Sequence, residues 1–176
     1  MLSEQDYYTR GQYLVIRSYQ PYKDFTAVVR LIRKELIPLS HTVQEENIPT
    51  DAELAARLSE GKCYVSCGRG RLETPDAFIH IVAEDDTLHV DMLAVSAASQ
   101  GKRIGRRLME IGEAYGIAEG CRIARLFVDH GNERAHRFYD RLGYQTIRYH
   151  PQLACFELAK TLPALAELAA SLLPAN

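Results

Sequence analysis

The residues whose types and spacing most clearly suggest a chemical function form a short loop of glycines and basic side chains. A strand-like apolar segment ends just before this loop, and apolar residues at helical spacing begin just after it. The first N–H groups of a helix have no intrahelical acceptor, and the helix dipole is positive there, so such a junction attracts anions. Gly101 and Gly105 allow a ligand to approach the backbone, while Lys102, Arg103 and Arg106 add positive charge. This combination predicts a diphosphate-binding loop.

The loop alone is compatible with one other interpretation, and three further ones are disfavoured. The same local pattern also occurs at the start of helices that bind no ligand, and the loop by itself does not exclude this alternative. A P-loop is disfavoured because no Gly-Lys-Ser/Thr follows a four-residue spacer, and a dinucleotide-binding loop is disfavoured because the glycines do not have Gly-x-Gly-x-x-Gly spacing. A basic nucleic-acid patch lacks interleaved aromatic residues for base stacking.

A second feature lies about thirty residues downstream, on a predicted helix. Asn132, Ala135, Phe138, Tyr139 and Leu142 follow three- and four-residue steps and therefore share one helical face. Packing explains Phe138 and Leu142. It does not explain why an Asn begins the stripe or why a phenol stands beside the Phe, so this face is a second candidate for chemistry.

The elements that must position these residues can be read from periodicity. Strands are expected at residues 13–19, 62–67, 77–83, 88–95, 124–128, 144–149 and 153–160, the second to fourth of these as an antiparallel meander. Helices are expected at residues 25–36 with Asp24 as N-cap, at 50–60 with a capping box formed by Thr50 and Glu53, and at 104–115, 133–142 and 164–173. The strand–helix–strand order after residue 88 indicates a crossover connection.

Composition limits the class of protein. The 176 residues suit one domain spanning 1–176 with a short C-terminal tail helix at 162–173, and a net charge of −2 offers no broad positive field for nucleic acid. No signal-peptide pattern and no membrane-spanning apolar run is seen, so we expect a cytoplasmic protein that does not associate with membranes. The four cysteines are expected to be free thiols. No metal site is predicted, because four scattered histidines lack the spacing of metal ligands: His41, His80, His136 and His150.

The two motifs together resemble those of the GCN5-related N-acetyltransferases (GNAT). Residues 100–105 resemble the family's Arg/Gln-x-x-Gly-x-Gly/Ala acyl-CoA loop at Gln100, Ile104 and Gly105, and residues 132–144 resemble the helix that follows downstream. The motifs have the family's order and separation, and the likeness covers most of the chain. One departure is Arg103, which stands where the family usually has Gly. The resemblance implies an α+β fold with a mixed, mostly antiparallel central sheet of six to seven strands flanked by helices.

The resemblance also implies a cosubstrate and a direct transfer. Acetyl-CoA would lie in a split between the strands at 88–95 and 124–128, with a backbone N–H near Ala94 acting as a small oxyanion hole. Tyr139 matches the family's general acid. The implied cosubstrate-binding residues lie along the strand end, the loop and the downstream helix: Leu93, Ala94, Val95, Gln100, Gly101, Lys102, Arg103, Ile104, Gly105, Arg106, Asn132 and Tyr139.

The strand that leads to the acetyl site supplies the candidates for the base. His89 and Asp91 are two residues apart and therefore share a face, and family members often place a base on this strand. A charged sheet face without catalytic function is the alternative. Asn132 is expected to bind the pantetheine arm, to cap its helix, or to do both.

The acceptor is left open within a class. A primary amine of a small molecule or peptide is expected, and Glu45, Glu46, Asp51 and His150 are candidates to face it if it is cationic. A non-catalytic acyl-CoA sensor of the same fold and transfer of a longer acyl chain or to a hydroxyl are the alternatives. The apolar tail at 162–173 suits packing either on its own sheet or against a second copy, and a homodimer is the expectation.

Overall fold

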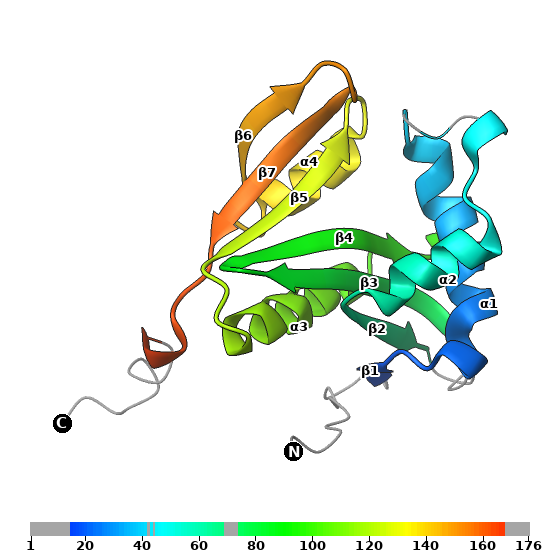
Figure 1. Ribbon diagram of the computed structural model, residues 1–176, viewed down its shortest axis with the longest axis horizontal. Helices are drawn as coiled ribbons and strands as arrows, with labels where there is room; N and C mark the ends of the chain where they lie inside the picture. Colours follow the sequence, from blue (N-terminus) through cyan, green and yellow to red (C-terminus); the bar gives the residue numbers. More distant parts are fainter. Residues whose placement is uncertain (1–14, 42, 44, 69–73, 168–176) are drawn as a thin grey trace.

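The computed structural model describes residues 15–41, 43, 45–68 and 74–167 (Figure 1). Its centre is a mixed sheet of seven strands within these residues, in the order β1-β2-β3-β4-β5-β7-β6. The strands are β1 (Val15–Ser18), β2 (Lys62–Cys67), β3 (Pro75–Glu84), β4 (Thr87–Val95), β5 (Ile123–Asp129), β6 (Gln145–His150) and β7 (Cys155–Thr161). The predicted mixed, mostly antiparallel sheet is confirmed, because β4 and β5 form the parallel pair and the other pairings described are antiparallel.

Helices cover both faces of this sheet. They are α1 (Pro21–Leu31), α2 (Asp51–Ser59), α3 (Ile104–Ala118) and α4 (Glu133–Asp140). Phe78 and Ile79 are neighbours on β3 and so point to opposite faces, and they belong to separate cores. The core around Phe78 contains residues of α1 and α2, whereas the core around Ile79 contains residues of α3 and is contacted by α4. The two motif helices therefore lie on the same side of the sheet.

The first helix begins earlier than predicted. Pro21 occupies its first turn and Gln20 is the N-cap, so Asp24 is not the cap but a residue of the first turn. Proline suits this position because its fixed φ matches a helix and its missing N–H would have no helical acceptor. The Asp24 carboxylate is fully buried and accepts hydrogen bonds from the Gln20 N–H at 2.8 Å and from both Arg17 nitrogens at 2.6 and 2.8 Å. The prediction that Asp24 caps the helix is therefore wrong, although its carboxylate still satisfies the backbone at this end.

The same helix changes geometry before its predicted end. After Leu31 the chain continues as one π-helical segment, η1 (Ile32–Leu36), and one 3₁₀ turn, η2 (Ile37–Leu39). The N–H of Ile37 donates to the carbonyl of Ile32, which is the five-residue step of a π-helix. The segment leads into the loop that faces the pocket described below.

The second helix starts as the sequence predicts. The Thr50 side chain accepts from the Glu53 N–H at 3.3 Å, and the Glu53 carboxylate accepts from the Thr50 N–H at 2.8 Å, which completes a capping box. Leu54 and Leu58 are buried one turn apart. Arg57 lies between them in sequence and points toward β4, which it reaches in the site.

The central meander contains a β-bulge. His80 pairs with Met92 and Ile81 pairs with Val90, so Asp91 is the extra residue on β4. A bulge changes which face the following side chains take. As a result Val90 enters the core under α3, whereas Met92 enters the core under α1 and α2.

The sheet opens between β4 and β5. Pairing is confined to Thr87–His89 of β4 and residues 123–125 of β5, after which the two strands diverge (Figure 1). The edge of β4 from Val90 to Val95 therefore has no partner strand on this side. The predicted split between these strands is confirmed.

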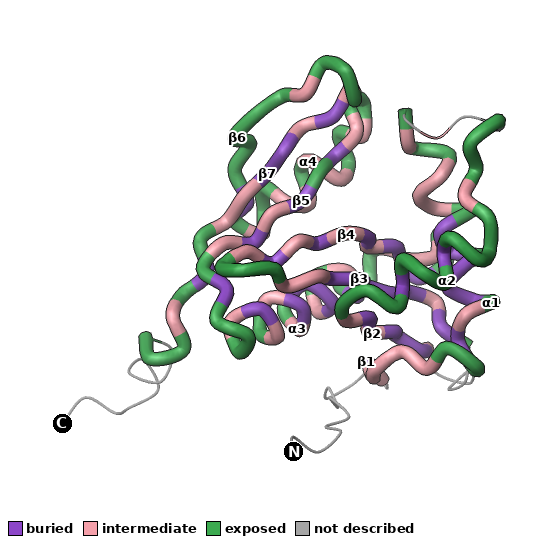
Figure 2. Tube along the Cα trace, viewed as in Figure 1, coloured by how far each residue is buried: buried purple, intermediate pink, exposed green. Residues whose placement is uncertain are grey.

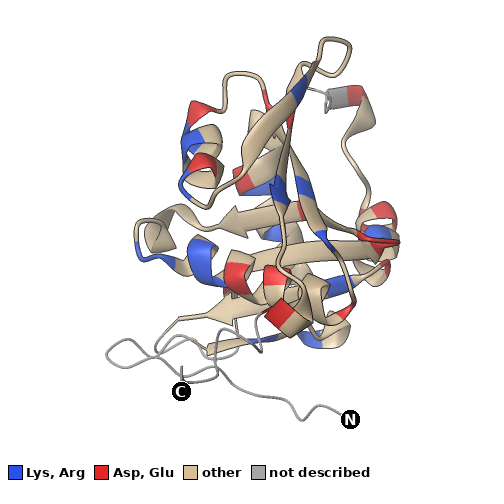
Figure 3. Cartoon of the chain, turned by 90° about the vertical axis from the view of Figure 1, so that its left-hand side faces the viewer, with Lys and Arg blue, Asp and Glu red and all other residues tan. Residues whose placement is uncertain are grey.

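The last strands form the least covered part of the molecule. β7 lies between β5 and β6, and β6 is exposed along nearly its whole length (Figure 2). Leu162 is buried after β7, but most of the predicted tail helix at 162–173 lies outside the described residues. On the side of the molecule that Figure 3 shows, basic and acidic residues are interspersed along the ribbon.

Candidate active site

The predicted anion loop has the backbone of a tight turn that leads into a helix. Gly101 has φ +77° and Arg103 has φ +62°, both in the left-handed region, and a Cβ on Gly101 would meet no heavy atom within 4 Å. Gly101 is therefore required for its backbone angle and not for space. Arg103 adopts the conformation that a glycine favours, so its presence leaves the turn intact.

The start of α3 leaves N–H groups free for an anion. Arg103 is the N-cap residue and makes no side-chain capping hydrogen bond, so the first N–H groups of this 15-residue helix lack a capping side chain. At Gly105 an added Cβ would lie 3.3 Å from the Phe138 ring, so this glycine permits close contact between α3 and α4. Both predicted motifs thus meet at the beginning of α3.

Two loop side chains hold the loop itself. The Gln100 amide donates to the carbonyl of Val95 at 2.9 Å, and the Lys102 ammonium donates to the carbonyl of Ala98 at 2.9 Å. Gln100 thereby ties the loop to the end of β4. Arg103 and Arg106 are both exposed beside them.

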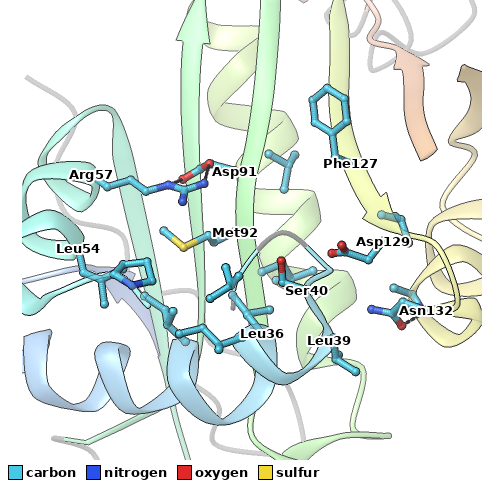
Figure 4. A pocket seen from close by; sticks show the side chains of 18 of the residues that line it. Leu36, Leu39, Ser40, Leu54, Arg57, Asp91, Met92, Phe127, Asp129 and Asn132 are labelled. Atoms are coloured by element: carbon cyan, nitrogen blue, oxygen red, sulfur yellow. Dashed lines mark hydrogen bonds and ion pairs between the residues drawn. The ribbon is translucent and has the colours of Figure 1, made fainter. Parts of the chain in front are cut away.

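A pocket lies beyond the unpaired edge of β4 (Figure 4). It has a volume of about 290 Å³ and is lined by η1 and η2, the following loop, α2, β4, β5 and α4. Most of its walls are aliphatic. The polar and ionisable side chains among the described lining residues are Ser40, Arg57, Asp91, Asp129, Asn132 and Tyr139.

Tyr139 is the phenol of this pocket. Its ring makes edge contacts with Phe138 and Tyr144, at centroid distances of 5.0 and 5.7 Å. Burial raises the pKa of Tyr139, because the surrounding apolar groups disfavour the charged phenolate. The hydroxyl therefore keeps its proton at neutral pH.

The Asp91 carboxylate forms hydrogen bonds with the side chains of Arg57 and His80. Its Oδ2 receives the Arg57 Nε–H at 2.9 Å and lies 2.7 Å from His80 Nδ1, and Arg57 also donates to Oδ1. Burial favours the neutral acid, but the hydrogen bonds from His80 and Arg57 outweigh it and lower the pKa of Asp91 to about 2. The carboxylate is therefore ionised at neutral pH and is a weak base.

The other predicted residues are placed as follows. His89 pairs in register with Arg125 at the closed end of the split, and it is not one of the described residues that line the pocket. The Asn132 side chain accepts from the Ala135 N–H at 3.1 Å, which confirms the N-cap, and Asn132 also lines the pocket. Asp91, Asn132 and Tyr139 are thus brought together, whereas His89 is not joined to them.

A comparison of the sequence with models of protein families shows which family the chain belongs to. The sequence model of the Acetyltransferase (GNAT) family matches residues 27–144. The chain belongs to this family. No curated protein sequence matches the chain significantly.

Solved GNAT and acetyltransferase structures have the same fold. Ard1 of Thermoplasma volcanium is 18% identical with a TM-score of 0.71, covering 85% of this chain and 98% of that chain. PaiA N-acetyltransferase of Thermoplasma acidophilum, solved in complex with coenzyme A, is 17% identical with a TM-score of 0.72 and coverages of 84% and 98%. The ribosomal-protein-S18-alanine N-acetyltransferase of Escherichia coli is 16% identical with a TM-score of 0.64 and coverages of 85% and 94%. At these identities the likeness establishes the fold.

Sequence reasoning does not predict two pocket residues of this GNAT chain, or the histidine that contacts Asp91. His80 was treated as a surface or core residue, yet it is 1% exposed and contacts Asp91. A lone polar residue inside the apolar run of β3 is a usable signal, because buried polar groups need partners. Arg57 and Asp129 had no comparable signal, since each looks like an ordinary charge at a helix surface or a strand end.

Three of the residues expected to face a cationic acceptor do not line the pocket. Asp51 is paired with Arg33 at 2.7 Å, and His150 is paired with Glu157 at 2.8 Å. Neither these two nor Glu46 is among the described residues that line the pocket, and the Glu45 side chain lies outside what the structure describes. The acidic residues that do line the pocket are Asp91 and Asp129.

The cysteines of this GNAT chain have no place in the pocket. All four are free and buried, and burial raises the pKa of Cys63, Cys67, Cys121 and Cys155. A protonated, buried thiol is a poor nucleophile. In the described part of the chain no three or more potential ligand side chains gather into a metal site, and no helix there is both long and apolar enough to cross a bilayer.

Proposed function

We propose that this chain is an acetyl-CoA-dependent N-acetyltransferase that moves an acetyl group directly to a primary amine. The observation that carries the proposal is the unpaired edge of β4, which runs between the uncapped start of α3 and the pocket that contains Tyr139. This arrangement offers backbone donors for a diphosphate at one end and a protonated acid at the other. Acetyl-CoA, when bound, supplies an activated thioester.

The chain's own residues fit the two halves of this cosubstrate. The N–H groups of the loop at 100–106 and of α3 would hold the diphosphate, with Lys102, Arg103 and Arg106 nearby as counter-charge. The β4 edge at Leu93 and Val95 would pair with the pantetheine amides. A backbone N–H near Ala94 would polarise the thioester carbonyl.

Proton transfers complete the reaction. The overall change is R–NH₃⁺ plus acetyl-CoA giving R–NH–acetyl, CoA–SH and H⁺. Tyr139 donates a proton to the departing thiolate and is later reprotonated, because its raised pKa keeps the hydroxyl protonated. No acyl-enzyme is needed, since the amine attacks the thioester directly.

The group that removes the amine's proton stays a prediction at His89 and Asp91. The low pKa of Asp91 favours an electrostatic role for that carboxylate over direct proton abstraction. His89 would need to act through water, because it does not line the pocket. A pH–rate profile of His89→Ala tests this: an unchanged profile excludes His89.

A homodimer is a further part of this proposal. The exposed apolar side chains of Phe127, Ile147 and Tyr149 on β5 and β6 support an association surface at this end of the sheet. Size-exclusion chromatography with light scattering would report one or two chains per particle.

Calorimetric titration with acetyl-CoA, with ATP as comparator, tests the central proposal. We expect micromolar binding of acetyl-CoA and much weaker binding of ATP. CoA release in the presence of an amine panel then tests turnover. Absence of acetyl-CoA binding would refute the proposal, and binding without turnover of any amine would favour a sensor.

A further inference from the structure

The polar groups of the pocket lie at two separate ends (Figure 4). Asp129 lies near Ser40 and Asn132 at one end, and the Arg57–Asp91 pair lies at the other. Aliphatic side chains lie between and below them, including Leu36, Leu39, Leu54 and Met92. An acceptor that enters this pocket therefore meets two charged ends and an apolar middle.

The end at Asp91 is not anionic. His80 Nε2 lies 2.7 Å from the carbonyl oxygen of Glu60, which only accepts, so this nitrogen carries a proton. His80 Nδ1 lies 2.7 Å from an Asp91 oxygen, and a hydrogen bond there requires a second proton on one of the two atoms. Whichever atom holds it, His80 and Asp91 together carry no net charge. With the Arg57 guanidinium the trio carries a net charge of about +1.

The end at Asp129 has the opposite sign. Its Oδ1 accepts the backbone N–H of His41 at 3.0 Å, and His41 Nδ1 lies 3.5 Å from the same oxygen. No Lys or Arg is paired with Asp129 among the described residues. Asp129 is therefore the carboxylate of the pocket that is not already neutralised by a guanidinium.

We propose that Asp129 binds the ammonium of the acceptor, and that the acceptor is a primary amine with an aliphatic body whose far end is neutral or anionic. The ammonium gains a charge-assisted hydrogen bond at Asp129, and the aliphatic walls bury the body of the molecule. A second cation at the far end meets the positive trio within a Debye length and is disfavoured. This inference rests on the proposed function, since it names the substrate class of the same site.

A matched series of three amines tests the proposal with the unmodified protein. n-Hexylamine, 6-aminohexanoate and 1,6-diaminohexane share a six-carbon body and differ in the charge of the far end. With CoA release as the readout, we expect kcat/KM for 1,6-diaminohexane to be roughly tenfold or more below the values for the other two. Equal or better use of the diamine would overturn the assignment of the far end.

Asp129→Asn tests the ammonium site itself. The amide keeps an oxygen for the His41 N–H but loses the charge, so KM for n-hexylamine should rise roughly tenfold or more with little change in acetyl-CoA affinity. Asp140→Asn is the matched control, because Asp140 is an exposed carboxylate on α4. An unchanged KM in Asp129→Asn would overturn the proposal.

Acetyl-CoA binding separates the possible failures. If acetyl-CoA binds the unmodified protein but none of the three amines is acetylated, the inferred acceptor class is wrong. The proposed N-acetyltransferase function is then tested by turnover of the wider amine panel. If acetyl-CoA does not bind, both proposals fail. Thermal unfolding of Asp129→Asn identifies a folding defect, and in that case the amine series decides.

Discussion

Two ionisable side chains of the pocket are driven to opposite protonation states. Tyr139 packs against the rings of Phe138 and Tyr144, and burial raises its pKa, so its hydroxyl keeps the proton. Asp91 is partly buried, but hydrogen bonds from His80 and Arg57 stabilise its anion and lower its pKa to about 2. Partners, and not burial alone, therefore decide which group can donate a proton and which supplies fixed charge.

Tyr139→Phe should remove the general acid without disturbing the fold. We expect kcat to fall by about a hundredfold, because general acid catalysis typically contributes 10²–10⁴. The Phe ring keeps the edge contacts with Phe138 and Tyr144, so acetyl-CoA affinity and thermal stability should not change. Tyr149→Phe on exposed β6 is the control. A kcat within twofold of the unmodified enzyme would exclude Tyr139 as the acid.

Asp91→Asn should lower stability in a pH-dependent way. The pKa of Asp91 is depressed from 3.8 to about 2 in the folded chain, so its stabilisation is present above about pH 4 and is lost as the pH falls toward 2. The shift corresponds to about 2 kcal/mol at neutral pH. Urea unfolding at pH 7 and at pH 3 should therefore show a large and then a smaller difference from the unmodified chain.

The control for that experiment is Asp86→Asn, in the exposed turn between β3 and β4. It should change the unfolding free energy little at either pH. A difference for Asp91→Asn that did not shrink at pH 3 would show that the loss comes from packing and not from charge.

At the scale of elements, the loop between β4 and α3 depends on two left-handed residues. Gly101 adopts this conformation without strain, whereas Arg103 adopts it at a cost of roughly 1–2 kcal/mol. The loop nevertheless presents the uncapped start of α3. Arg103 therefore changes the strain and the charge of the loop more than its path.

Arg103→Gly and Arg103→Ala separate these two effects. Glycine relieves the left-handed strain but adds freedom to the unfolded chain, so we expect a net gain in unfolding free energy of about 0.5 kcal/mol. Alanine keeps the strain and should leave stability nearly unchanged. Both remove the guanidinium and should weaken acetyl-CoA binding by roughly threefold, measured by calorimetry. If acetyl-CoA bound much more weakly to Arg103→Gly but not to Arg103→Ala, this separation of backbone strain from side-chain charge would be wrong.

At the scale of the molecule, the sheet consists of two parts joined at one end. β4 and β5 pair over three residues each, and the rest of the split is open toward the pocket. A ligand that binds in the split contacts both parts at once. Cosubstrate binding should therefore stabilise the fold as a whole.

Acetyl-CoA at a hundred times its Kd should raise the melting temperature by about 5–10 °C. Mass action contributes about 2.7 kcal/mol at that concentration, and each kcal/mol shifts Tm by about 2–4 °C for a chain of this size. Differential scanning fluorimetry measures the shift, with ATP at the same concentration as the control. An equal shift with ATP would indicate binding to phosphate alone.

Local patterns were sufficient for most elements and for the two motifs. The capping box at Thr50, the glycine loop before α3 and the Asn132 cap depend on residues within a few positions of one another, so they can be predicted from sequence. The start of α1 was misassigned because Pro21 and Asp24 both suit a helix N-terminus and only the observed backbone distinguishes them.

The arrangement of charges in the pocket depends on tertiary structure. Arg57, His80 and Asp91 come from a helix and two strands, and only the packing of α2 beside the paired strands β3 and β4 brings them together. The placement of β7 between β5 and β6 is likewise a matter of strand pairing. The glycine loop before α3 and the strands of the sheet can be predicted from the sequence, since both depend on local spacing. The charges that line the pocket depend on contacts between distant segments, so local spacing does not predict them.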